Sequence, residues 1–241
     1  MMFARDFCKK WDIASYHCRE RFASKKNEVA LYTFINSQGQ AWDWVVKKYC
    51  QPQSSNKEAE ILTVLYTAGL TVPKLIAAAD NYLVLEYIKG QNLLTWCEEQ
   101  EKKTQGQTIT QEVVTVLEQL AAWFVNCYRI LDDFYGYSIA LNDVNLRNFI
   151  AAERIYGLDF EDCRAGTKVE DMGKFCAFAL TYDPAFTFWK YQFILAVKDI
   201  IIKRLELPWN AVFLEMGKEL QRMSQRRQRQ DFSLDRLDAI K

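Results

Sequence analysis

Five polar residues occur in an order that suits the transfer of a phosphate group. Lys47 lies in a segment with strand alternation, and Glu58 follows in the next segment, which has helical periodicity. Asp143 and Asn148 come much later, five positions apart, and Asp159 ends a short apolar segment. A lysine can neutralise the α- and β-phosphate oxygens of ATP while a glutamate holds it, and Asp and Asn oxygens are ligands that magnesium prefers. The order therefore predicts phosphoryl transfer from ATP, with magnesium, to a hydroxyl group.

Each of these residues taken alone is ordinary. An Asp and an Asn at this spacing occur in most chains of this size, and an acidic residue often ends a strand. Lys47 is less ordinary, because a charge on the inward face of a sheet needs a partner. Glu58 could be that partner, but such an ion pair is equally typical of a purely structural salt bridge. The prediction therefore depends on the order of the residues along the chain.

The elements that must position these residues change character at Gly90. Before it, the patterns predict antiparallel strands and one helix. The strand-like sequence begins at Arg19, and the clearest strands are Glu28–Phe34, Ala41–Tyr49, Lys74–Ala79 and Tyr82–Tyr87. The turns between them are expected at Ala23–Asn27, Asn36–Gln40 and Asp80-Asn81. The helix is expected at Lys57–Ala68, after a loop at Gln51–Asn56 and before Gly69.

Almost all of the chain after Gly90 has helical periodicity. Helices are predicted at Gln111–Leu131, from the capping box Thr167–Glu170 to Leu180, at Pro184–Leu205 and at Pro208–Arg229. Two short strands, Asn148–Ala151 and Arg154–Asp159, interrupt them. A small β-rich lobe over residues 1–89 and a larger helical lobe over 90–241 make an α+β pattern, and a cleft is expected between such lobes.

The composition excludes several other classes of protein. Half of the 241 residues are apolar, and 31 basic and 31 acidic residues cancel, which predicts a globular chain with no general affinity for nucleic acid or membrane. No apolar run is long enough to be expected to span a membrane, and Met1–Lys10 has no apolar run, so we do not expect it to be a signal peptide. Seven scattered cysteines indicate reduced thiols and hence a cytoplasmic protein. With His17 as the only histidine, catalysis must use Asp, Glu, Lys and Asn.

The stretch Arg222–Arg229 is a local exception to the charge balance. It could contact nucleic acid, a phosphorylated substrate or anionic lipid. Acidic residues follow it immediately, so a solvated helix end is the preferred interpretation. The sequence does not indicate an oligomeric state.

The segments that hold these residues resemble the protein-kinase-like superfamily. They are most similar to its compact, divergent branch: aminoglycoside and choline phosphotransferases, lipopolysaccharide core sugar kinases and RIO-like kinases. The segments that carry the resemblance are Val45–Tyr49, Lys57–Leu62, Gly69–Pro73, Leu83–Gly90, Asn142–Asn148 and Gly157–Glu161. The resemblance implies a bilobal kinase-like fold. Residues 1–89 would be the nucleotide-binding N-lobe, and residues 90–241 the C-lobe with the catalytic loop, the metal site and the acceptor side.

The resemblance also implies how the nucleotide is bound. Lys47 would bind the phosphates and Glu58 would hold it, with Lys48 and Glu60 as rival assignments. Lys47 is preferred because it shares a strand face with Val45, which would then lie over the adenine.

Three further residues would contact or flank the adenine ring. Leu85 would stand in front of the hinge that joins the two lobes. The hinge would bind adenine through the carbonyl of Glu86 and the amide of Ile88.

The resemblance gives the later residues catalytic and metal-binding roles. Asp143 becomes the catalytic base position, and Asn148 and Asp159 become the magnesium ligands. Asp171 resembles the helix aspartate that braces the catalytic loop in this superfamily.

The chain departs from the superfamily at the phosphate-binding loop, because the turn Ala23–Asn27 contains no glycine. The short interval from Asp159 to Thr167 leaves no room for a phosphorylation-controlled activation segment. We therefore expect a phosphotransferase acting on an unidentified hydroxyl, most simply of a small molecule or sugar. The alternatives are an atypical RIO-like protein kinase, and a pseudokinase that binds nucleotide or serves as a scaffold.

Overall fold

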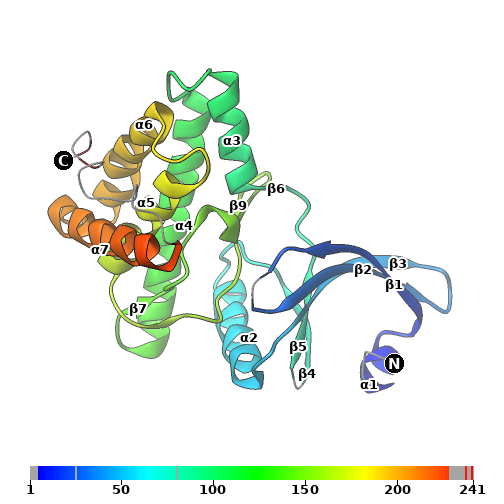
Figure 1. The fold of residues 1–241 in the computed structure, drawn as a ribbon. Helices are drawn as coiled ribbons and strands as arrows, with labels where there is room; N and C mark the ends of the chain where they lie inside the picture. The colour runs from blue at the N-terminus through cyan, green and yellow to red at the C-terminus, as the bar shows by residue number, and fades with distance from the viewer. Residues whose placement is uncertain (1–4, 25, 80, 228–236, 238–239, 241) are drawn as a thin grey trace. The chain divides into compact units, whose positions relative to one another are not determined.

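The computed structural model describes residues 5–24, 26–79, 81–227, 237 and 240. The chain divides into two compact units, Met1–Lys89 (unit 1) and Gly90–Lys241 (unit 2). Unit 1 is built on an antiparallel sheet and unit 2 is mainly helical, so the chain is of the expected α+β class (Figure 1). Among the described residues, no helix combines the length and the apolar character needed to cross a membrane.

A five-stranded antiparallel sheet forms most of unit 1. Its strands, in spatial order, are β1 (Ile13–Phe22), β2 (Glu28–Asn36), β3 (Ala41–Lys48), β5 (Tyr82–Glu86) and β4 (Leu75–Ala79). The strands predicted from Glu28 onwards are confirmed. Strand β1 begins earlier than Arg19, because an exposed edge strand does not need the apolar alternation that sequence patterns detect. Two of the predicted turns include Lys25 and Asp80, which lie outside the described residues.

The sheet of unit 1 has buried side chains on both faces. On one face, Tyr32 and Phe34 belong to an aromatic cluster, and Phe7 of helix α1 (Arg5–Lys10) packs edge-on against Phe34, with ring centres 5.8 Å apart. Because side chains alternate along a strand, Lys47 of β3 points to the opposite face. That face is the one on which the second helix of unit 1 packs.

Helix α2 covers Pro52–Thr67. It begins before Lys57, so the predicted loop Gln51–Asn56 is wrong beyond its first residue. Proline is well tolerated at the first position of a helix, because its missing N–H would have no intrahelical partner there. Gly69 follows the helix with a left-handed φ of 83°, as expected for the residue that ends it.

Unit 2 is built from helices. They are α3 (Leu93–Lys103), α4 (Gln111–Tyr135), α5 (Lys168–Thr181), α6 (Phe188–Val197), which continues as a π-helical segment Lys198–Ile202, and α7 (Trp209–Arg227). The Thr167 hydroxyl accepts a hydrogen bond from the Glu170 amide at 3.2 Å, so the predicted N-terminus of α5 is confirmed. Helix α3 is not evident in the sequence, because the polar stretch Glu98–Gln107 obscures its buried apolar positions, which are Leu93, Leu94 and Cys97.

The ends of the last helices differ from the prediction. Helix α6 begins at Phe188 rather than Pro184, because the Thr187 hydroxyl caps it. Near the end of α7, Arg222 and Arg226 both form ion pairs with Glu219, at 3.1 and 2.6 Å. The rest of the basic stretch, from residue 228, lies outside the described residues. The ion pairs favour the interpretation of this stretch as a solvated helix end.

Two small antiparallel sheets carry the loops of unit 2. Their strands are β6 (Gln91–Asn92), β8 (Phe149–Ala151) and β9 (Ile155–Gly157) in one sheet, and β7 (Ile139–Ala140) and β10 (Arg164–Ala165) in the other. The two predicted strands correspond to β8 and β9. A Cβ atom on Gly157 would come within 2.1 Å of the Trp123 ring, so only glycine lets β9 lie this close to α4. This contact fixes the end of β9, two residues before Asp159.

The seven cysteines are thiols rather than disulfides, as expected. Cys18 and Cys50 are exposed in unit 1, whereas the cysteines of unit 2 are all buried: Cys97, Cys127, Cys163 and Cys176. Burial raises the pKa of Cys176 to about 12 and also raises the pKa values of Cys97 and Cys127.

Candidate active site

Lys47 and Glu58 form an ion pair in unit 1. The Lys47 Nζ lies 2.7 Å from Glu58 Oε2, and the two side chains are only 7% and 2% exposed. The Tyr49 hydroxyl donates to the same oxygen at 2.6 Å, and the Lys47 ammonium lies 4.9 Å from the centre of the Tyr49 ring. The expected ion pair is therefore present. Tyr49 is a further member that the sequence analysis missed.

The rival residues lie elsewhere. Lys48 points away from Glu58, and its Nζ lies 3.6 Å from Glu28 Oε1 with both side chains largely exposed. Glu60 lies on the exposed side of α2. Strand alternation explains the difference, because neighbouring residues of β3 face opposite sides of the sheet. Of the rival assignments, the pair that is buried is thus Lys47 with Glu58.

Leu85, Glu86 and Ile88 lie at the end of β5 and just after it. Leu85 is buried and pairs with Val45 of β3. The Glu86 carboxylate accepts a hydrogen bond from the Lys74 amide at 3.1 Å, and the Glu86 amide donates to the Lys74 carbonyl at 2.9 Å. Ile88 lies in irregular backbone beyond the strand. These contacts position the segment, and its adenine-binding role stays a prediction.

The loop from Leu141 to Asn148 in unit 2 is held by its own side chains. The Asn145 Nδ2 donates to Asp143 Oδ1 at 3.0 Å. The Asn148 Nδ2 donates to the Asp143 carbonyl at 2.7 Å and reaches its carboxylate at 3.4 Å. The structure therefore brings Asp143 and Asn148 together, and it adds Asn145, which the sequence analysis missed.

Asp159 lies next to this loop. The Leu158 amide donates to the Asn148 carbonyl at 2.8 Å, which continues the pairing of β8 with β9. Carboxylate oxygens of Asp159 and Glu161 lie within 4.8 Å of each other. Amide and carboxylate oxygens are the hard ligands that magnesium prefers, so the residues present here fit that ion. Glu161 is a further candidate ligand that the sequence analysis did not name.

Asp171 of α5 holds the start of the loop. Its carboxylate accepts hydrogen bonds from the amides of Leu141 and Asn142 at 2.6 and 2.9 Å, and from the Tyr128 hydroxyl at 2.9 Å. The predicted bracing contact is therefore confirmed. Burial raises the pKa of Asp171 to about 6, although these three hydrogen bonds act in the opposite direction. Burial, reinforced by the Asp171 charge, also raises the pKa of Tyr128.

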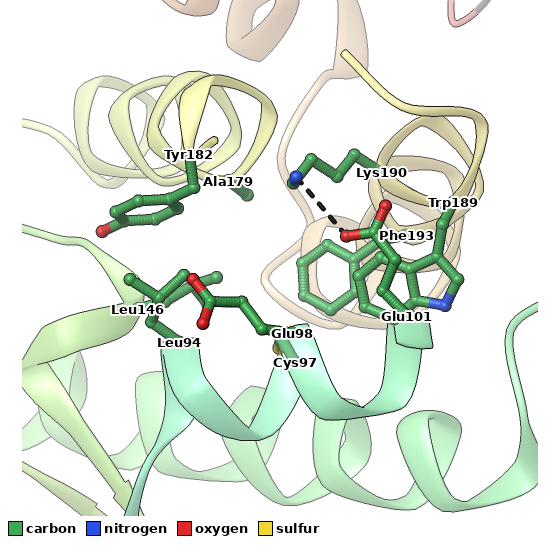
Figure 2. Close-up of a pocket in the computed structure, with 10 residues that line it drawn as sticks. All are labelled: Leu94, Cys97, Glu98, Glu101, Leu146, Ala179, Tyr182, Trp189, Lys190 and Phe193. Atoms are coloured by element: carbon green, nitrogen blue, oxygen red, sulfur yellow. Dashed lines mark ion pairs between the residues drawn. The ribbon is translucent and has the colours of Figure 1, made fainter. Parts of the chain in front are cut away.

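A hollow in unit 2 reaches the loop at Leu146 (Figure 2). Its walls are mainly apolar side chains from α3, α5 and α6. Figure 2 shows the Lys190 ammonium pointing toward Glu101, whose Oε2 lies 3.4 Å away. Tyr182 forms another wall, and its hydroxyl donates to Asn145 Oδ1 at 3.2 Å. The hollow is thus linked to the loop through Asn145.

The signals for the missed residues differ. Tyr49 lies two positions after Lys47, so strand alternation places it on the same face and could have identified it. Tyr128 is 43 positions away from Asp171, and no sequence spacing links a buried phenol to a carboxylate at that separation. Only the packing of α4 against α5 brings those two side chains together.

An antiparallel sheet with an ion-paired lysine, a helical unit with an Asp-x4-Asn loop and a strand-terminal Asp are features of the protein-kinase-like superfamily. Comparison with protein families identifies the branch. The RIO domain family matches residues 19–143, just over half of the chain, and the chain belongs to this family. The match ends at Asp143, so Asn148, Asp159 and Asp171 lie beyond it. A comparison with curated proteins gives no match.

Proposed function

We propose that the chain is an atypical, RIO-like kinase that transfers the γ-phosphate of ATP to a hydroxyl group in the presence of magnesium. The observation that carries the proposal is the buried Lys47–Glu58 ion pair, which lies within the residues matched by the RIO domain. A buried ion pair adds little net stability, because desolvation offsets the attraction between its charges. Binding the phosphates of ATP is a physical reason to keep such a pair.

The residues of unit 1 would bind the nucleotide. Lys47 would contact the α- and β-phosphate oxygens, and Glu58 would hold its ammonium in position. The carbonyl of Glu86 and the amide of Ile88 would bind the adenine, with Leu85 in front of them. These adenine contacts involve the backbone, so they depend little on residue type.

The residues of unit 2 would carry out the transfer. Asp143 would orient the acceptor hydroxyl and accept its proton. Asn148 and Asp159 would hold magnesium, with Glu161 as a third oxygen ligand. When bound, the ion neutralises charge on the phosphate oxygens. Asp171 would keep the loop in place through the hydrogen bonds that it accepts from two backbone amides.

The family match bears on the acceptor. It supports the RIO-like kinase alternative better than the small-molecule or sugar phosphotransferase that the sequence first suggested. A hydroxyl of a protein is therefore the first acceptor to test. Only eight positions separate Asp159 from Thr167, too few for a long activation segment, so we propose a kinase without phosphorylation-controlled peptide docking.

The test is to measure nucleotide binding and phosphate transfer separately. Millimolar MgATP should raise the melting temperature of the protein, since a ligand that binds only the folded state stabilises it. Radiolabelled ATP should then transfer phosphate to protein acceptors, to the chain itself or to a panel of small hydroxyl compounds. Lys47→Met should abolish the thermal shift, whereas Lys48→Met, a matched change on the other face of β3, should retain it.

Each outcome separates the alternatives. A melting curve that neither MgATP nor MgADP moves would contradict the proposal. A thermal shift that depends on Lys47, without transfer to any acceptor, would instead support the pseudokinase alternative. Transfer to small hydroxyl compounds alone would restore the sugar or small-molecule interpretation.

A further inference from the structure

Asn142, the residue before Asp143, has an unusual backbone conformation. Its φ is 68°, in the left-handed region that asparagine tolerates better than most residues. The Asp143 amide donates back to the Leu141 carbonyl at 2.9 Å, which closes a three-residue turn around Asn142. A three-residue turn with a positive φ at its centre is rare and strained. Such a conformation persists only where surrounding contacts determine it.

Helix α5 supplies contacts to both backbone polar groups of Asn142. Asp171 accepts the Asn142 amide at 2.9 Å, and the Lys174 Nζ donates to the Asn142 carbonyl at 3.1 Å. Asp171 and Lys174 are three positions apart, so they lie on the same side of the helix. One helix face therefore holds the N–H and the C=O of a single residue.

The side chain of Asn142 is held as well. Its Oδ1 accepts a hydrogen bond from Lys174 at 2.5 Å and another from the Arg164 Nε at 3.1 Å. Arg164 is itself oriented by an ion pair with Glu170 at 2.8 Å. Among the described residues, the hydrogen bonds of the Lys174 ammonium both go to Asn142. The Lys174 charge also acts on the Asp171 carboxylate, because it lowers the pKa of that group.

From these contacts we propose that Lys174 is a positioning residue for the transfer step. It holds Asn142 in the left-handed conformation, and that conformation sets the direction in which the Asp143 carboxylate points. Lys174 is a positioning residue rather than a catalytic one, because it acts through Asn142. The kinetic part of this inference rests on the proposed function, whereas its structural part does not.

The experiment compares three variants with the wild type. Lys174→Met removes the charge and the donors but keeps the length of the side chain. Lys174→Arg keeps a cationic donor. Lys168→Met removes a different lysine of the same helix, which forms an ion pair with Asp132 at 3.0 Å and, among the described residues, no hydrogen bond with Asn142. The readouts are hydrogen exchange of the amides of residues 141–148, and kcat and KM for MgATP.

In Lys174→Met, the hydrogen-exchange rates of the Asn142 and Asp143 amides should rise about tenfold. This is the change expected for losing a hydrogen bond to a charged group. Its kcat should fall about 100-fold, the effect of a misplaced reacting group, while KM for MgATP stays within about twofold. Lys174→Arg should recover most of both losses. Lys168→Met should leave the exchange of these amides and kcat unchanged.

Two results would overturn the inference. One is unchanged exchange at Asn142 and Asp143 in Lys174→Met. The other is faster exchange with unchanged kcat, which would limit Lys174 to a structural role. A wild type without any turnover would contradict the proposed function instead, and the exchange rates would still decide whether Lys174 holds the loop.

Discussion

Lys47 and Tyr49 donate hydrogen bonds to the same atom, the Oε2 oxygen of Glu58, at 2.7 and 2.6 Å. Lys47 lies on β3 and Tyr49 follows the last residue of that strand, two positions further on, so both donors approach Glu58 from one side of the sheet. A carboxylate oxygen that accepts two hydrogen bonds is held more firmly than one that accepts a single bond from a flexible lysine. Tyr49 therefore contributes to the position of Lys47 through the carboxylate oxygen that the two share and through its ring, whose centre lies 4.9 Å from the ammonium.

Tyr49→Phe should lower the free energy of unfolding by about 2 kcal/mol, because it removes a buried hydrogen bond to a charged acceptor. Urea denaturation would measure the loss. Tyr66→Phe is the matched control, since Tyr66 lies exposed on α2 of the same unit and should change stability little. Equal losses in the two variants would contradict the role assigned to Tyr49.

Asp143→Asn and Asp159→Asn should have different effects under the proposed function. Asp143 acts when the acceptor hydroxyl attacks, so its loss should lower kcat by about 100-fold or more and leave MgATP affinity nearly intact. Asp159 would hold magnesium, so its loss should weaken MgATP binding as well as turnover. Calorimetry with MgATP and a transfer assay would separate the two effects. Equal losses of affinity would instead make Asp143 a second metal ligand.

The stability of the protein should depend on pH through Asp171. Its pKa is about 6 in the folded protein, against an ordinary value of 3.8, so the folded state binds this proton more tightly than the unfolded state. The contribution of Asp171 is therefore fully present below about pH 3.8 and is lost as the pH rises through 6. The slope of this loss is at most about 1.4 kcal/mol per pH unit.

The comparison of wild type with Asp171→Asn isolates this contribution. The free energy of unfolding of the wild type should exceed that of Asp171→Asn by most near pH 4. The difference between the two should become smaller toward pH 7. Denaturant unfolding at a series of pH values would measure both proteins. Parallel stability profiles would show that Asp171 does not titrate in this range. Tyr128→Phe removes a hydrogen bond that lowers the pKa of Asp171, so it should move the transition to higher pH.

The ion pair beside the hollow of unit 2 gives a prediction about stability. Lys190 and Glu101 are 6% and 15% exposed, and the Thr187 hydroxyl also donates to Glu101. Lys190→Met should lower the free energy of unfolding by about 3 kcal/mol, because it leaves the Glu101 carboxylate buried without its cation. The double variant Lys190→Met/Glu101→Gln should recover part of that loss, which a double-mutant cycle would measure. Additive losses would show that the two side chains do not interact energetically.

The elements that the sequence predicted well are those with strong local signals. The β-branched and aromatic residues of β2 and β3 alternate, and α4 has a long apolar stripe, so local pattern and tertiary burial agree there. Where an element buries only one side and its sequence is mostly polar, the apolar periodicity that would predict it is weak. Strand β1 is largely exposed and α3 buries few of its residues, so the part of β1 before Arg19 and the whole of α3 were not predicted.

The candidate site divides in the same way. Alternation along β3 was enough to choose Lys47 over Lys48, because a face of a strand is a local property. The contacts that hold Asn142 were not predictable, since Arg164 and Lys174 lie 22 and 32 positions away from it. Side chains that meet through a backbone turn of positive φ leave no periodic pattern in the sequence.

The uneven burial of the cysteines has a practical consequence for site-specific fluorescent labelling of this protein. A maleimide reacts with an accessible thiolate, so Cys18 and Cys50 should take up a dye while the four thiols of unit 2 stay unmodified in the folded state. Unit 1 also holds Cys8, which is half-buried, so removing Cys8 and one of the two exposed thiols would leave a single fluorescent position in unit 1 without any change to unit 2. The natural sequence thus already provides an attachment point for a reporter in the unit that we propose binds the nucleotide.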